Sequence, residues 1–259
     1  MTEPKAATPL DVPFPDADPL ELAFAVGACR LELRRGADAP WVQGTYDDPS
    51  GALPWTLHRE GGRVRIAQEV RLAGTFGLRH GAPRFSLALG TGRRFALAVE
   101  GGASDFDLDL GGVPLTRLSI RQGAGRLRCD FSAPNPADLD RIDVEAGAMA
   151  LELVNLANAA FSELRLDGGA AAWELDFGGT LRRDATVRIA AGVSSVRLVV
   201  PAATAARVIP ESTLGTLDVG DGYMKREGAF LTEAALAGKT PALTIRVALS
   251  LGALRIATR

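Results

Sequence analysis

The sequence predicts an all-β, single-domain parallel β-solenoid, a β-helix-like fold made of stacked copies of one short unit. A motif of the form apolar-x-apolar-x-x-Gly-x-x-x-apolar-x-apolar recurs along most of the 259 residues. Most copies follow one another at 21 to 24 residues, a period typical of solenoids and propellers. Inside each copy apolar and other residues alternate, which is the pattern of half-buried strands.

Residues 1–19 precede the first copy and are predicted to form an extended lead-in. Five of the fifteen prolines of the chain lie here, and proline-rich segments are extended. The segment lacks the basic start and apolar run of a secretory signal. No apolar stretch reaches the roughly 20 residues that a membrane span needs. We therefore expect a cytoplasmic protein without direct membrane insertion.

The solenoid domain is expected to span residues 20–259, with a hinge glycine at the corner of each copy. The predicted hinges are Gly27, Gly81, Gly102, Gly123, Gly147, Gly169 and Gly192, with Ser250 in the equivalent position of the last copy. A sharp corner commonly needs a positive φ, which glycine adopts without a steric penalty. Apolar pairs on both sides of the hinge are expected to face the core, such as Phe76 and Leu78 before Gly81, or Leu127 and Cys129 after Gly123.

Charged residues occupy an outward position five residues after the hinge in successive copies. Because neighbouring strands lie about 4.8 Å apart, we expect ion pairs between Asp107 and Arg128, Arg128 and Glu152, and Glu174 and Arg197. Exposed pairs of this kind contribute little to stability. The row is interpreted as a solvated face.

Two segments interrupt the period. Residues 38–74 contain the turn signals DDPSG and EGG between strand-like runs, which predicts an antiparallel hairpin extension. Residues 201–241 are polar and Gly-rich and are expected to be irregular, with one helical turn at EAALAG. The first segment carries four residues that could form a binding surface or could instead cover one end of the solenoid: Trp41, Tyr46, Trp55 and His58.

Little in the sequence points to catalysis, and we expect no enzyme activity, no cofactor and no metal site. The only histidines are His58 and His80, and neither has a partner at metal-ligand spacing. Cys29 and Cys129 are too few for a disulfide framework and are interpreted as buried apolar residues. A net charge of −2 also argues against a nucleic-acid partner, because such proteins carry a basic surface.

An acidic row offers an alternative function. Asp105, Asp107 and Asp109 alternate along one strand, so their side chains share one outward face. Outward carboxylates on β-helices can act on sugars, and a line of carboxylates can attract calcium. We regard the row as ordinary surface and keep carbohydrate binding or polysaccharide processing as the alternative.

The central block resembles a known family. The stretches FALAVEGGASDFDLDLGGVPLTRLSIRQGAGRLRCDFSAP, AWELDFGGT and VRLVVP are similar to the bacterial toast-rack, putative-adhesin-like β-solenoid domains. Those domains are related to the C-terminal domain of LiaF-type cell-envelope stress regulators. The resemblance covers roughly residues 20–210. It implies a β-solenoid without enzymatic activity and supplies no catalytic residues.

The predicted function is therefore that of a non-catalytic interaction or assembly module. A solenoid must cap its end rungs, or their open edges recruit other chains. The last copy, residues 243–258, has the regular pattern with no cap after it. We expect a protein partner or self-association through this terminal rung.

Overall fold

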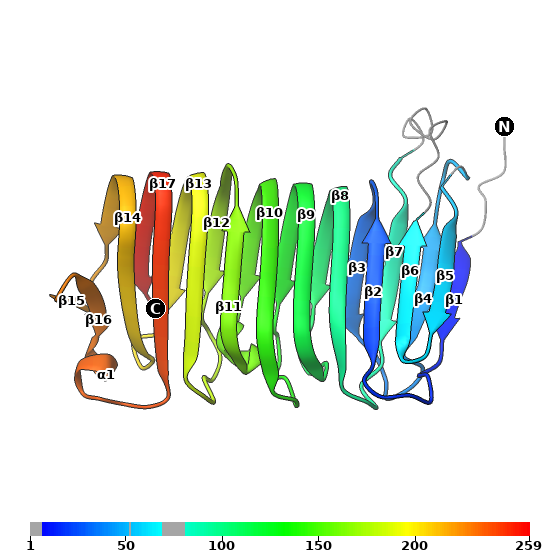
Figure 1. Ribbon diagram of the computed structural model, residues 1–259, viewed down its shortest axis with the longest axis horizontal. Helices are drawn as coiled ribbons and strands as arrows, with labels where there is room; N and C mark the ends of the chain where they lie inside the picture. Colours follow the sequence, from blue (N-terminus) through cyan, green and yellow to red (C-terminus); the bar gives the residue numbers. More distant parts are fainter. Residues whose placement is uncertain (1–6, 52, 69–80) are drawn as a thin grey trace.

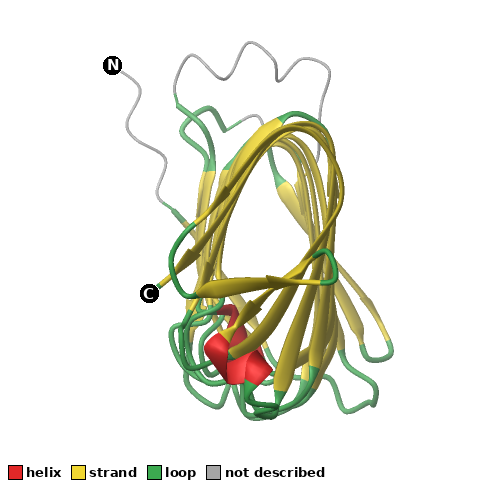
Figure 2. Ribbon diagram, turned by 90° about the vertical axis from the view of Figure 1, so that its left-hand side faces the viewer, coloured by secondary structure: helices red, strands yellow, loops and turns green. Residues whose placement is uncertain are grey.

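The computed structural model describes residues 7–51, 53–68 and 81–259. Within these ranges, seventeen strands form one continuous sheet, which winds into a solenoid (Figure 1). Seen along the stack, each rung is an arch: its two halves run up and down opposite walls and meet in a bend (Figure 2). The predicted all-β solenoid is confirmed.

Most rungs pass through the bend as one long strand. These strands are β8 (Phe95–Asp109), β9 (Leu115–Asp130), β10 (Leu139–Val154), β13 (Ala185–Val200), β14 (Ala205–Val219) and β17 (Ala242–Thr258). In other rungs the two halves are separate strands: β2 (Glu21–Val26) with β3 (Arg30–Arg35), β6 (Arg63–Gln68) with β7 (Arg84–Leu89), and β11 (Phe161–Gly168) with β12 (Ala171–Asp176). Neighbouring rungs pair in parallel through both halves.

The register stacks the predicted repeat on itself. Gln122 pairs with Ala146 and Ala124 with Ala148, so Gly123 lies opposite Gly147. The same reasoning along the stack gives one column: Gly27, Gly102, Gly123, Gly147, Gly169, Gly192 and Ser250. This column runs along the bend on the outer surface of the solenoid, and we call it the corner column.

The expected reason for glycine in this column is wrong. At Gly102, Gly123, Gly147, Gly169 and Gly192 the backbone is not in the positive-φ region. Close approach of neighbouring rungs provides a better explanation. A Cβ added to Gly147 would press into the carbonyl oxygen of Gly123 on the next rung. Positive φ occurs instead two residues later, at Gly125, where φ is 114°.

The apolar columns on either side of the bend form the core. Leu118, Ile120, Leu127 and Cys129 of β9 are at most 1% exposed, and the equivalent residues of other rungs are also buried. Large side chains lie opposite glycines across the bend. The ring of Phe106 fills the space beside Gly101, and the ring of Trp173 fills the space beside Gly168.

The rung expected around Gly81 differs from the prediction. Its first half is β6, whose inward residues Val64 and Ile66 were assigned to the insertion. Gly81 lies before β7 with φ of 106°, unlike the glycines of the corner column, and the pairing of β7 with β3 begins only at Arg84. The expected inward residues Phe76 and Leu78, as well as His80, lie outside the described residues.

Antiparallel strands cover the N-terminal end, in agreement with the predicted hairpin extension. β5 (Trp55–Glu60) forms a hairpin with β6, and β4 (Val42–Asp47) pairs with β7. The lead-in contributes a strand of its own, β1 (Thr8–Val12), which pairs with β4 along its whole length.

The order of rungs at the C-terminal end corrects two expectations. β17 lies between β13 and β14 and pairs with both, so residues 243–258 are not an open edge. The segment 201–241, expected to be irregular, holds β14, which is the outermost rung. The hairpin of β15 (Tyr223–Arg226) and β16 (Ala229–Thr232) follows, and α1 (Glu233–Leu236) forms the helical turn expected at EAALAG.

Among the described residues, helix is limited to two short turns, α1 and the 3₁₀ turn η2 (Leu156–Ala159). Within the described ranges no helix has the length and apolarity to cross a membrane.

Candidate functional site

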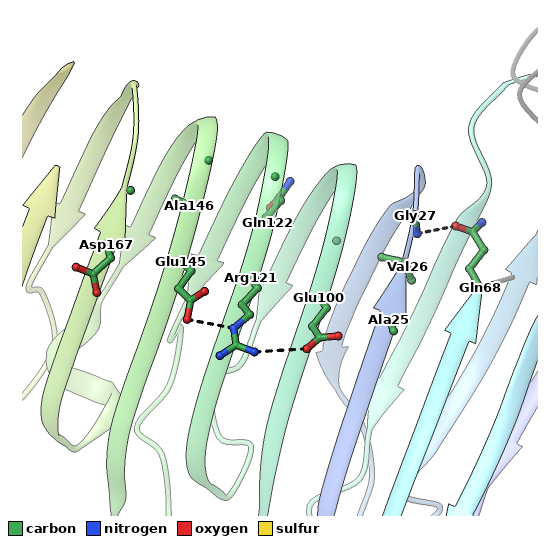
Figure 3. A pocket seen from close by; sticks show the side chains of 14 residues that line it. Ala25, Val26, Gly27, Gln68, Glu100, Arg121, Gln122, Glu145, Ala146 and Asp167 are labelled. Carbon is green, nitrogen blue, oxygen red and sulfur yellow. Dashed lines mark hydrogen bonds and ion pairs between the residues drawn. The ribbon is translucent and has the colours of Figure 1, made fainter. Parts of the chain in front are cut away.

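A shallow groove follows the corner column on the outside of the solenoid. It has a volume of about 810 Å³ and crosses six neighbouring strands, β6, β2, β8, β9, β10 and β11 (Figure 3). At about 4.8 Å between strands, six strands span about 24 Å. The groove is therefore long enough for an extended chain and too open to enclose a small molecule.

Backbone forms the floor of the groove. Gly27, Gly101, Gly123, Gly147 and Gly168 line it and have no side chains to fill it. The steric contact that keeps side chains out of the corner column thus also keeps the groove open. A ligand that lies along the floor meets main-chain atoms of successive rungs.

Charged side chains form one wall, two residues before the corner in four adjacent rungs. Glu100, Arg121, Glu145 and Asp167 occupy adjacent rungs in this order. Arg121 lies between two carboxylates, 3.8 Å from Glu100 and 3.1 Å from Glu145 (Figure 3). Asp167 forms no ion pair with any described residue. Arg65 of β6 also contacts Glu100, at 3.7 Å, so three carboxylates meet two guanidinium groups and the wall keeps a net negative charge, at the Asp167 end.

A buried polar network closes the groove at the β6 end. Gln68 is 6% exposed, and its side-chain oxygen accepts a hydrogen bond of 3.0 Å from the Gly27 amide. Its amide group donates to the hydroxyl of Tyr46 at 3.1 Å, and that hydroxyl donates to the carbonyl of Leu53. Burial raises the pKa of Tyr46 to about 12. The network anchors the N-terminal cap to the first corner.

A second buried amide lies beneath the middle of the groove. Gln122 is 3% exposed, and its amide nitrogen donates to the carbonyls of Ser104 and, at 3.0 Å, of Ala124. Its side-chain oxygen has no hydrogen-bond partner in the described part of the chain.

The four residues predicted as a binding surface are split between core and surface. Trp41 is fully buried, stacked on Phe14 and edge-on to Phe95, and Tyr46 is 4% exposed. These two cannot contact a partner without unfolding of the cap. Trp55 is half-buried and His58 is exposed, both on β5 at the N-terminal end.

The three carboxylates of the acidic row on β8 already have ion-pair or hydrogen-bond partners within the chain. Asp107 pairs with Arg34 at 2.6 Å, and Asp105 lies 4.0 Å from Arg30. Asp109 accepts hydrogen bonds from the Ser132 hydroxyl at 2.6 Å and the Gly111 amide at 3.0 Å. No cluster of side chains suited to a metal ion occurs among the residues that the structure describes.

The outward row after the corner follows most of the expected pairing. Arg128 pairs with Glu152, and Arg197 lies 3.4 Å from Glu174. Asp107, expected to pair with Arg128, instead pairs with Arg34.

The resolved pKa shifts of acids and thiols reflect structural roles. Burial raises the pKa of the Cys29 thiol to about 12 and also raises that of Cys129. Asp48 has a lowered pKa because it accepts hydrogen bonds from Ser50 and from the amide of Leu53, which outweigh its partial burial. These shifts move the thiols away from the reactive thiolate form at neutral pH.

Reasoning from the sequence missed the groove, although a signal was present. The residues just before and at the corner are mostly glycine or alanine, and the position two before the corner reads Glu100, Arg121, Glu145 and Asp167. When the copies are aligned at the position two residues before the corner, and not only at the inward apolar positions, they show a row of charged residues beside a row of glycines.

Comparison with known proteins gives a family match over the first part of the chain. The model of the N-terminal domain of toast_rack (DUF2154) matches residues 2–153. No protein with a curated description matches. Among solved structures, the chain is similar to "a putative cell adhesion protein" from Clostridium sporogenes at 13% identity and a TM-score of 0.55. That likeness covers 98% of this chain and 99% of the other, and at this identity it concerns the fold.

Proposed function

This chain belongs to the toast-rack family, and on that premise we propose that it is a non-catalytic, adhesin-like interaction module. The groove along the corner column carries the proposal, because it is a long, open surface on rigid, parallel strands. Such a surface suits a polymer that contacts many rungs at once. The similarity to a structure described as a putative cell adhesion protein is consistent with this function.

The charge of the groove selects the class of ligand. Its charged lining comprises Glu100, Glu145 and Asp167 against Arg121. The carboxylate of Asp167 is left without an ion pair in the described structure, and Glu145 shares its arginine with Glu100. We therefore assign the groove to an extended segment with cationic side chains. At about 3.4 Å per residue, about seven residues would span the groove.

Carbohydrate binding is the weaker alternative. Proteins commonly stack aromatic side chains on sugar rings, and the described lining of the groove includes no aromatic residue. The acidic row on β8, the other candidate sugar surface, is engaged by arginines and hydrogen-bond donors.

Binding of a lysine peptide tests the proposal. The probe is Lys-Ser-Lys-Ser-Lys-Ser-Lys with blocked ends, and the comparison peptide has glutamate in place of lysine. In isothermal titration calorimetry we expect the lysine peptide to bind and the glutamate peptide not to bind. The affinity for the lysine peptide should fall as salt is raised, because exposed charges are screened.

Two variants with the same change of charge locate the site. Asp167→Lys should weaken binding of the lysine peptide at least tenfold. Glu174→Lys, on the opposite wall of the solenoid, should leave it within twofold. Equal losses in both variants, binding of the glutamate peptide, or binding of a neutral oligosaccharide in its place would overturn the proposal.

A further inference from the structure

Exposed apolar side chains concentrate toward the C-terminal end of the stack. The described chain has four large hydrophobic residues that are strongly exposed: Val193, Leu217, Met224 and Leu251. Val193 and Leu251 are register neighbours on the bend of β13 and β17. Leu217 and Met224 belong to the outermost elements, β14 and β15.

Leu217 is exposed because the core is open at this end. It pairs with Leu254 of β17, which is fully buried, so it occupies an inward column of the solenoid. In β14 the same position is 41% exposed. The end rung therefore presents part of the cross-section of the core to its surroundings.

The cap covers only part of this end. On its outer side β14 pairs with β16 at Arg207 and Val208, and the described residues show no pairing there from Ile209 to Val219. Figure 2 shows the hairpin of β15 and β16 across the lower part of the end, with the arched part of β14 beyond it. The end thus has a projecting half and a recessed half.

The outer face of the hairpin completes the apolar surface. Tyr223 packs against the core, and Lys225 lies over the ring of Phe230. Side chains alternate along a strand, so Met224 and Arg226 face the other way. Met224 is 57% exposed, and Arg226 has no ion pair with any described residue.

The backbone of β14 argues against an added strand as the occupant. Pro210 lacks an amide proton, and the register with β17 shifts between Pro210 and Ser212 and again between Thr213 and Gly215. Proline and bulges on an edge strand block regular pairing with another sheet. A partner must therefore meet this end through side chains.

A second copy of the chain fits these features. A twofold axis at this end would place the projecting half of one copy against the recessed half of the other and would bring Met224 toward the exposed core at Leu217. The end also carries both signs of charge, Arg226 on the hairpin and Asp221 on the turn before it, neither of which has an ion pair within the described chain. A surface that carries both signs of charge, and both a projecting and a recessed half, can be complementary to the same surface on a second copy.

We propose that the C-terminal end, formed by β14 and the outer face of β15 and β16, is a self-association surface that pairs two copies into a closed dimer. The N-terminal end does not offer a matching surface, since β1, β4 and β5 cover it and the described residues there include no strongly exposed large hydrophobic side chain. When the C-terminal ends of two copies pair, only the covered N-terminal ends remain, so no further copies are added. This surface is separate from the groove, so either proposal can fail alone.

Molar mass measured by light scattering after size exclusion, over a wide range of concentration, tests the dimer. The 259-residue chain should shift from about 27 kDa toward twice that value and go no further. Met224→Glu and Leu217→Glu should each raise the dissociation constant at least tenfold. Val193→Glu is the matched control, since Val193 is 60% exposed but lies on β13, with β17 between it and the end strand β14, and it should leave the constant within twofold.

The outcomes separate the proposal from its rivals. Circular dichroism and the melting temperature of each variant identify any loss of folding, and the second end variant then provides the comparison. A monomer at all concentrations overturns the proposal. So does a ladder of larger species, which would indicate head-to-tail growth, or a dimer that Val193→Glu weakens as much as Met224→Glu.

Discussion

At the scale of single residues, the distance between neighbouring rungs decides the composition of the corner column. Rungs approach so closely at the bend that a Cβ in one of them meets a carbonyl oxygen of the next. The contact is severe at Gly147 and ordinary at Gly169, where the distance to the Gly147 oxygen would be 3.5 Å. Glycine is therefore required at some positions of the column and only tolerated at others.

This difference gives a prediction for two alanine substitutions. Gly147→Ala should lower the free energy of unfolding by about 1–3 kcal/mol, the usual cost of overpacking. Gly169→Ala should change it by less than about 0.5 kcal/mol, as for an ordinary surface position. Urea denaturation followed by circular dichroism measures both. A similar effect of the two substitutions would contradict the steric explanation.

The sequence predicts which residues form the columns but not why glycine occupies the corner. Alternation of apolar residues is a property of the chain alone, so the inward positions of β9 follow directly from it. The contact of Gly147 with Gly123 joins residues of different rungs, and its distance depends on how the bend is shaped. A preference for positive φ and a need for close approach select the same amino acid, so the sequence does not distinguish them.

At the scale of elements, the last strand stabilises the C-terminal part of the stack from within. β17 pairs in parallel with β13 through both halves and with β14 on its other side. Its inward residues Leu243, Ile245, Leu254 and Ile256 are at most 1% exposed. Without β17, β13 would lose its neighbour on one side, and β14 would keep only its short pairing with β16.

Removal of β17 should therefore have a large effect. In a chain that ends after Thr240, the part that follows β13 should no longer unfold cooperatively on heating. The chain should also form large species in size exclusion, because the strand edges of β13 and β14 that pair with β17 are exposed. A synthetic peptide of residues 241–259 should restore cooperative unfolding, whereas a scrambled peptide should not. An unchanged melting temperature in the shortened chain would show that β17 is dispensable.

The repeat pattern of the sequence does not predict that β17 lies between β13 and β14. The pattern identifies each rung by its own residues, and successive rungs are then assumed to be neighbours. At both ends the chain skips a place and returns: β2 and β3 lie between β8 and the rung of β6 and β7. β14 was missed as a rung because Pro210 and its register shifts break the repeat.

At the scale of the whole molecule, the groove depends on the number of rungs in register. Five of the six rungs contribute a glycine to the floor and four contribute a charged side chain to the wall, and the six strands together give a length of about 24 Å. The site is thus a property of the stack, and no short motif encodes it. This explains why the aromatic residues of the first insertion appeared more prominent in the sequence, although Trp41 and Tyr46 belong to the core.

Hydrogen exchange with and without the saturating lysine peptide, read by mass spectrometry, tests the central claim most directly. The account predicts slower exchange of backbone amides at residues 100–104, 121–124, 145–148 and 167–169, which line the groove or border it. The opposite wall, such as residues 172–176 of β12, should be unchanged. Protection on that wall, or at β5 alone, would contradict the groove as the binding site.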